Sequence, residues 1–144
     1  MNKLFLIVGT FVSISILILT LYSSYLAFFP IKPFTINQQP FKVVNNVLHP
    51  GDPITFESDA CRDGKYEVTV YPTLKGDYVL NLTPFHFVSS PGCSKILNNS
   101  LYVPQWTKPG KYYLELNNQI KITSNRMLTL TTTTEEFWVV KIEE

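Results

Sequence analysis

The residues of this sequence that could do redox or metal chemistry are two cysteines, Cys61 and Cys93, and two histidines, His49 and His86. A copper site on a β-fold would need histidine and methionine ligands soon after a cysteine, and no histidine follows Cys93. His49 lies in a Leu-His-Pro-Gly sequence typical of a turn, and His86 stands between two phenylalanines in a strand-like run. We therefore predict no metal ligand and no cofactor.

The carboxylate and hydroxyl residues form no catalytic pattern. There is no Gly-x-Ser-x-Gly sequence and no glycine-rich phosphate loop. The carboxylate pairs Glu135-Glu136 and Glu143-Glu144 are adjacent, so in a strand their side chains would point to opposite faces. They could not converge on one bond as the two carboxylates of a glycosidase do. We predict no catalytic residue and do not expect an enzyme.

The two cysteines have a structural interpretation. Both follow an apolar N-terminal segment and lie in a region that has the pattern of a folded domain. An even pair in such a place favours one disulfide, Cys61 to Cys93, in an oxidising compartment. The alternative is two buried free thiols in a cytosolic domain.

A proline-bounded loop carries the residue that we consider most suited to binding. Trp106 lies between Pro104 and Pro109, and tryptophan is enriched at interaction hot spots. A role for Trp106 in the core is equally compatible with the sequence. The following Pro109-Gly110 turn precedes Tyr112, as in the tyrosine corner of immunoglobulin-like domains, so Tyr112 is expected to serve the fold.

Composition excludes one class of partner. The chain has 144 residues, enough for one ordinary domain, with 12 basic and 11 acidic residues and a net charge of +1. Binding to a nucleic-acid backbone usually requires a basic face or a strongly basic domain. No nucleic-acid partner is therefore expected.

The apolar residues are concentrated near the N-terminus. No charge occurs between Lys3 and Lys32, and 16 of the residues in 4–29 are Leu, Ile, Val or Phe. A helix of this length can cross a bilayer. We predict a short tail at 1–3, a transmembrane signal anchor at 4–29 and a linker at 30–40. The balance of lysines on the two sides does not decide the orientation.

The alternative to an anchor is a cleaved secretory signal. Such signals have apolar regions of only about 7–15 residues that end in small side chains. Here the run is longer, and Tyr22 and Tyr25 occupy positions where a small side chain would be needed. An uncleaved anchor is the favoured interpretation.

The predicted helix has a stripe of small residues. Gly9, Ser13, Thr20 and Ser24 fall on one side of a helical wheel. Small residues allow membrane helices to approach closely, so this face could support self-association or a partner helix. The alternative is that small hydroxylated residues are simply common in such helices.

The remaining residues, 41–144, have the pattern of an all-β domain. Short β-rich runs alternate with Pro, Gly, Asn and Asp at intervals near ten residues, and Ile54 and Phe56 alternate with Thr55 and Glu57. We predict an immunoglobulin-like β-sandwich of about seven strands. The expected strands are Phe41–Leu48, Ile54–Cys61, Tyr66–Leu74, Tyr78–Val88 with a break at Pro84, Ser100–Val103, Lys111–Ile122 and Met127–Ile142.

Several motifs also resemble a known group of proteins over about residues 43 to 140. They are Pro50-Gly51-Asp52-x-Ile54-x-Phe56, Pro91-Gly92-Cys93, Val103-Pro104 and Pro109-Gly110-x-Tyr112-x-Leu114. This order is similar to that in small signal-anchored β-sandwich proteins found in tailed-phage genomes. The resemblance implies an immunoglobulin-like fold, a cysteine pair and a phage or bacterial source. That group has no established activity, so no functional residue can be transferred.

Together these patterns predict a role in binding. The sequence favours a membrane-anchored immunoglobulin-like module, held outside the cytoplasm, that binds or blocks a protein partner at a host envelope. The alternative is a structural or assembly subunit of a larger membrane or virion complex.

Overall fold

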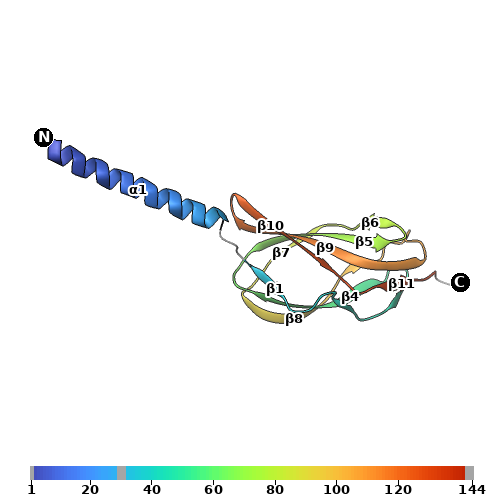
Figure 1. Cartoon of the computed structure of the whole chain (residues 1–144). Helices are drawn as coiled ribbons and strands as arrows, with labels where there is room; N and C mark the ends of the chain where they lie inside the picture. Colours follow the sequence, from blue (N-terminus) through green and yellow to red (C-terminus); the bar gives the residue numbers. More distant parts are fainter. Residues whose placement is uncertain (1, 29–31, 142–144) are drawn as a thin grey trace. The chain divides into compact units, whose positions relative to one another are not determined.

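The computed structural model describes residues 2–28 and 32–141, without the side chains of 2–6 and 28. The chain divides into two compact units, one ending at Ile31 and one beginning at Lys32. The first unit is a single helix, α1 (Asn2–Phe28). The second unit is built of β-strands (Figure 1).

Helix α1 agrees with the predicted apolar segment. Its window Ile7–Ala27 has a mean hydropathy of 1.9, and none of that window is buried. Such a helix is long and apolar enough to cross a membrane.

The β-domain consists of two sheets. In the first sheet, the central strand β4 (Pro53–Arg62) pairs on one side with β1 (Phe34–Ile36) and β2 (Lys42–Val43), and on the other with β8 (Gly92–Tyr102). In the second sheet, β9 (Gly110–Thr123) is central. Its partners are β5 (Glu67–Gly76) on one side and β10 (Arg126–Thr133) and β11 (Phe137–Val139) on the other.

Three short strands complete the second sheet. Strand β3 (Val47–Leu48) lies parallel to β11, whereas β6 (Val79–Asn81) and β7 (Phe85–Val88) lie antiparallel to β5. Of the seven expected segments, the second and fifth belong to the first sheet and the third, fourth, sixth and seventh to the second, while the first is divided between the two sheets. The two sheets and the single N-terminal helix confirm the predicted all-β fold class; the fourth segment, β6 and β7, departs from the immunoglobulin order, in which the fourth strand joins the first sheet.

The strand count among the described residues is higher than predicted because β1 was not expected and three expected strands are each divided in two; the strand Tyr78–Val88 becomes β6 and β7, on either side of the predicted break at Pro84. The expected strand Phe41–Leu48 becomes β2 and β3, since the chain leaves the first sheet after Val43 and joins the second at Val47. The expected strand Met127–Ile142 becomes β10 and β11, which contact different parts of β9. Its last residue, Ile142, lies outside the described residues.

Two other boundaries differ from the sequence interpretation. The segment 30–40, expected as a linker, contains β1, which pairs with the end of β4. Strand β8 begins at Gly92, not at Ser100. Gly92 has a φ of +115°, which favours glycine, so a sharp turn immediately precedes the strand. Most of β8 is exposed, which explains its weak apolar alternation.

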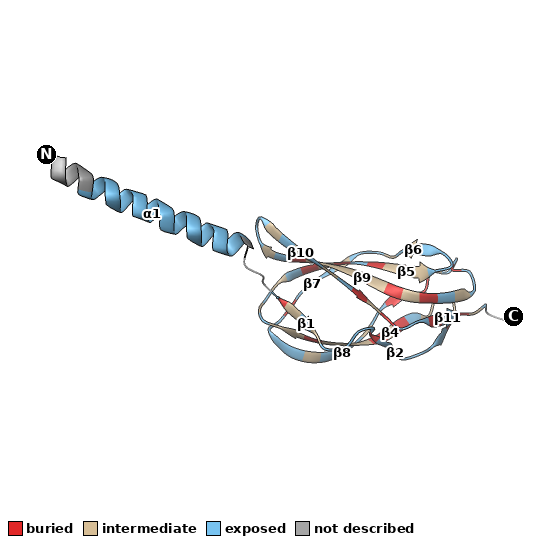
Figure 2. Cartoon of the chain, in the orientation of Figure 1, coloured by how far each residue is buried: buried red, intermediate tan, exposed pale blue. Residues whose placement is uncertain are grey.

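The core lies between the inward faces of the two sheets, as the buried positions in Figure 2 show. On β4 the predicted alternation is confirmed: Ile54 and Phe56 are buried while Thr55 and Glu57 are partly exposed. We call the end where β4 begins, at Pro53, the closed end of the domain. The end where β4 finishes, at Arg62, is the open end.

Candidate functional site

The loop that carries Trp106 connects β8 to β9 at the closed end, and hydrogen bonds fix it on both sides. Before the tryptophan, the Val103 amide donates to the Asp52 carbonyl oxygen at 2.9 Å. After it, the Thr107 amide donates to the Pro104 carbonyl oxygen at 3.0 Å. The Tyr112 hydroxyl donates to the Lys108 carbonyl oxygen at 3.0 Å, which is the expected tyrosine corner.

The Trp106 side chain itself points into solvent. It is 76% exposed, whereas the next residue, Thr107, is buried. Of the two roles that the sequence left open, the structure therefore places Trp106 outside the core. A large aromatic side chain on a backbone held in place loses little conformational freedom on binding.

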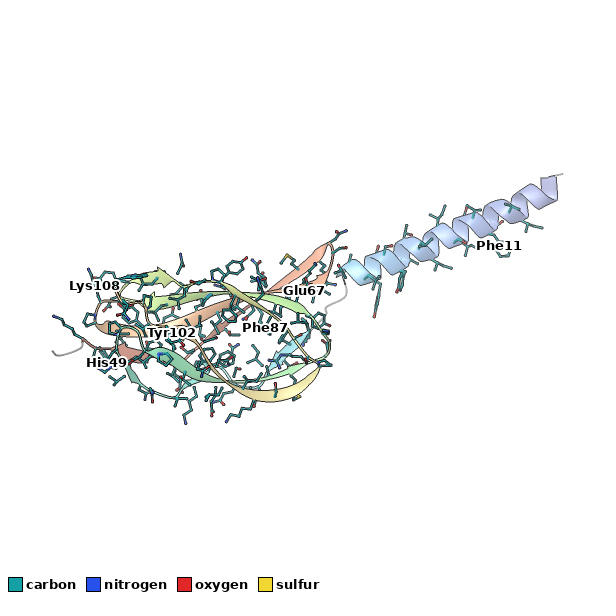
Figure 3. The ribbon with its side chains drawn as sticks, turned by 180° about the vertical axis from the view of Figure 1, so that it is seen from behind. Phe11, His49, Glu67, Phe87, Tyr102 and Lys108 are labelled. Carbon is teal, nitrogen blue, oxygen red and sulfur yellow. A yellow bond between two sulfur atoms is a disulfide. The ribbon has the colours of Figure 1, made fainter. Side chains whose placement is uncertain are left out.

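Other exposed rings occur at the same end. Tyr102 is 59% exposed, and the Lys108 ammonium lies 4.6 Å from the centre of the Tyr78 ring, a cation–π geometry. Figure 3 shows Tyr102, His49 and Lys108 at this end of the domain. The closed end thus presents aromatic groups and a cation to solvent.

This end lies far from the point where the chain enters the domain. Strand β1 pairs with Arg62 at the finish of β4, while Tyr102, just before the Trp106 loop, pairs with Pro53 at its start. The ten residues of β4 span roughly 30 Å at the rise of an extended strand. The Trp106 loop and the N-terminal end of β1 are therefore at opposite ends of the domain.

The predicted disulfide is present. Cys61 on β4 and Cys93 on β8 are directly opposite partners in the ladder, and their sulfur atoms are bonded. The bond joins neighbouring strands of one sheet, unlike the disulfide of antibody domains, which joins the two sheets. It therefore holds the edge strand β8 to the first sheet at the open end.

The small-residue face of α1 makes hydrogen bonds within the helix. Ser13 donates to the Gly9 carbonyl oxygen at 2.9 Å, and Thr20 donates to the Leu17 carbonyl oxygen at 2.8 Å. Such bonds satisfy the hydroxyl donors where no water is available, as a membrane interior requires. For Ser13 and Thr20, close packing is therefore the main contribution that the side chains could make to association.

The titratable groups with altered pKa values belong to separate structural contacts. A hydrogen bond from Lys75, with 2.8 Å between Nζ and the carboxylate, lowers the pKa of Glu115. A similar hydrogen bond from Lys95 lowers the pKa of Glu57. Burial raises the pKa of the Tyr112 hydroxyl. Glu57 lies on β4, whereas Tyr112 and Glu115 lie on β9 at positions that alternate between its two faces, so the three groups do not converge on one point.

The histidines take the structural positions expected for them. His86 is exposed on β7. The Asp52 carboxylate accepts a hydrogen bond from the His49 amide at 2.7 Å and lies 3.2 Å from His49 Nδ1, which closes the turn before β4. Within residues 2–28 and 32–141, no three His, Cys, Asp or Glu side chains are grouped so that they could hold a metal ion.

The sequence analysis did not predict a cavity of about 300 Å³ that lies between the sheets toward the open end. Its lining includes Ser58, Ala60 and Arg62 from β4 and Asn118 from β9. Two features of the sequence could have indicated this cavity. The inward side chains of β4 become smaller along the strand, and on β9 an asparagine stands between two inward apolar residues.

Comparison with known proteins gives no further guide to function. No protein-family model matches the sequence, and a search of curated proteins finds no significant match.

Proposed function

We propose that this chain is a single-pass membrane protein whose β-domain binds a protein partner through the Trp106 loop. The observation that carries the proposal is the contrast between the fixed backbone of that loop and its exposed tryptophan side chain. Its backbone is hydrogen bonded on both sides, yet the indole is 76% exposed at the end of the domain opposite β1. A rigid, solvent-facing tryptophan is typical of an interaction hot spot.

The membrane part of the proposal is supported by α1. Its exposed apolar surface would be costly in water, and its length suits a bilayer. We propose that the segment remains attached as a signal anchor and does not act as a cleaved signal.

The disulfide supports the proposed side of the membrane. Disulfides persist in oxidising compartments and are rare in the cytosol. We therefore place the β-domain outside the cytoplasm in this proposal. The resemblance to phage proteins extends it to a phage-encoded module that acts at a host envelope by binding or blocking.

The test compares the two tryptophans of the chain. Trp106→Ala and Trp138→Ala each remove an exposed indole, 76% and 52% exposed, but Trp138 lies on β11 outside the loop. Full-length variants would be expressed in the native host and cross-linked in intact membranes, and the proteins joined to them quantified. We expect Trp106→Ala to lose its cross-linked partner and Trp138→Ala to retain it. A partner retained by Trp106→Ala, with the domain folded, would overturn the proposal.

A chimera separates this proposal from the alternative of an assembly subunit. Replacing α1 by an unrelated membrane span should leave partner binding intact if the β-domain alone presents the binding surface. Loss of the partner in this chimera, in a protein that is still membrane-inserted and folded, would favour a subunit whose helix also packs into the complex.

A further inference from the structure

The cavity at the open end results from the sizes of the inward side chains. Along β4 the inward residues decrease from Ile54 and Phe56 to Ser58 and Ala60. The ring of Phe56 stacks with that of Phe41, with 5.9 Å between ring centres, and both rings line the cavity. Beyond them, the small side chains cannot fill the space between the sheets. The resulting volume of about 300 Å³ is at the lower end of the range for small-molecule sites.

The cavity is accessible from the side of the sandwich. Strand β7 pairs only with β5 and strand β8 only with β4, so both are edge strands of their sheets among the described residues. Phe87 on β7 and Ile96 on β8 line the cavity and are 38% and 40% exposed. Figure 3 shows Phe87 away from the closed end that carries Tyr102 and Lys108. These two side chains form an apolar entrance.

The polar side chains of the interior are mostly engaged with each other or with the backbone. The Asn98 amide donates to the Ser58 hydroxyl at 2.8 Å. The Asn118 amide donates to the Leu130 carbonyl oxygen at 3.0 Å. Since these donors are occupied, the interior offers mainly apolar surface from phenylalanine, valine and isoleucine side chains. An occupant of this space would therefore be largely hydrocarbon.

One cationic group stands at the end of this apolar space. Arg62 lines the cavity, its Nη1 donates to the Ser94 hydroxyl at 2.8 Å, and its guanidinium lies 5.5 Å from the centre of the Phe34 ring. Its Nε is buried and has no hydrogen-bond partner. Among the residues that the structure describes, no carboxylate forms a salt bridge with Arg62. The arginine retains donors that suit an anionic oxygen group.

We propose that this cavity binds an amphiphile with one alkyl chain and an anionic head group. The alkyl chain lies between the sheets beyond Phe56, and the carboxylate or phosphate of the head group binds Arg62. The inference is independent of the Trp106 loop, which is at the closed end. The membrane setting rests on the anchor proposed above: a domain tethered to a membrane span by a short segment would meet such molecules at high effective concentration.

The experiment uses the full chain reconstituted in phosphatidylcholine vesicles with a photoactivatable fatty acid. After illumination, the labelled peptides are identified by mass spectrometry. We expect labelling of β7 and β8 peptides in addition to α1, whose contact with lipid provides an internal positive control. If α1 is labelled and the β-domain is not, the proposal is wrong.

Competition tests the role of Arg62. Unlabelled fatty acid should displace the probe from the β-domain about tenfold more effectively than the fatty alcohol of equal length, because only the acid forms a charge-assisted hydrogen bond. In Arg62→Gln this preference should disappear. A purely structural arginine would lower the binding of acid and alcohol together, and an unchanged preference would contradict the assignment of the head group.

A second variant tests the position of the alkyl chain. Ala60→Phe should fill the cavity and abolish labelling of the β-domain, whereas Thr55→Phe, on the outward face of the same strand, should leave it unchanged. Equal labelling of a folded Ala60→Phe protein would overturn the proposal. If Ala60→Phe does not fold, the proposal is still tested by whether Arg62→Gln loses the preference for fatty acid over fatty alcohol.

A further arm identifies the source of the anionic group. Vesicles that contain lysophosphatidylglycerol, which has one acyl chain and a phosphate, should reduce probe labelling of the β-domain if the site accepts membrane lipids. If only added fatty acid competes, the ligand is a free acid. Failure of both competitors would contradict the proposal.

Discussion

The closed and open ends of the same sandwich are stabilised by different means. At the closed end, Leu114 and Phe137 are completely buried and the buried Tyr112 fixes the adjoining loop. At the open end, Ala60 lines a cavity, and a disulfide and the contact between Arg62 and Ser94 join β8 to β4. Side-chain packing dominates at one end and cross-strand links at the other.

This difference shows how a small domain can keep an internal space. A cavity removes dispersion contacts and weakens the association of the two sheets around it. A disulfide between neighbouring strands restricts the unfolded chain without occupying the interior. The open end can therefore remain partly hollow while completely buried side chains such as Leu114 and Phe137 fill the closed end.

The largest expected effect comes from removing a ring at the closed end. Phe137→Ala should lower the free energy of unfolding by about 3–5 kcal/mol, because it leaves a cavity in a completely buried site. Phe87→Ala, at the partly exposed entrance of the open end, should cost less than half as much. Urea unfolding of the full chain in detergent, followed by circular dichroism, measures both. Equal losses would contradict the proposed contrast.

Removal of the disulfide should have the next largest effect. The bond closes a loop with a sequence separation of 32 residues, so Cys61→Ser with Cys93→Ser should cost roughly 3–4 kcal/mol. Hydrogen exchange should become faster in the first half of β8, with little change in β9. An unchanged unfolding midpoint, or two reactive thiols in the unfolded and unreduced wild type, would show that the bond does not contribute as proposed.

Enlarging a buried side chain should destabilise the filled closed end more than the partly hollow open end. Ala60→Leu adds atoms to the side chain that lines the cavity, so its cost should be below about 1 kcal/mol. Val103→Leu adds fewer atoms but occupies a site that is 1% exposed near the closed end, and should cost about 1–3 kcal/mol. Thermal unfolding of the two variants gives the comparison. A greater loss in Ala60→Leu would indicate that the open end is filled.

The smallest effect on stability should come from the contact between Lys75 and Glu115 on the second sheet. The hydrogen bond from Lys75 lowers the pKa of Glu115, so the charged carboxylate stabilises the folded state at pH values above the ordinary glutamate pKa of the unfolded chain. This contribution is lost as the pH falls through the lower pKa of the folded state. Glu115→Gln should therefore reduce stability slightly at neutral pH, and the difference from wild type should vanish in acid. A difference independent of pH would indicate a loss of packing.

Local patterns were sufficient for much of the fold. The apolar run agrees with α1, and alternation located β4, β5 and β9 to within a few residues. The turn at Ser124-Asn125, between two runs rich in β-forming residues, joins β9 to β10 as a hairpin. These features depend on residues that are close in sequence, so period and turn chemistry are enough to predict them.

The pairing of the strands was harder to predict from the sequence. The N-terminal part of β8 was missed because an edge strand with few buried residues has little apolar alternation. The interruption between β10 and β11 coincides with Thr134, which bridges to Phe41, and a bridge between distant residues leaves no local signal. The exposure of Trp106 also depended on whether another strand would cover it.

The sequence by itself determined the apolar helix, the all-β character of the remainder and the candidate cysteine pair, because length, periodicity and residue type carry that information locally. Only the tertiary structure decided that Trp106 is exposed and that a cavity lies beside Ala60 and Arg62. A residue's period shows which face it occupies, but whether space remains there depends on the volumes of side chains from several distant strands.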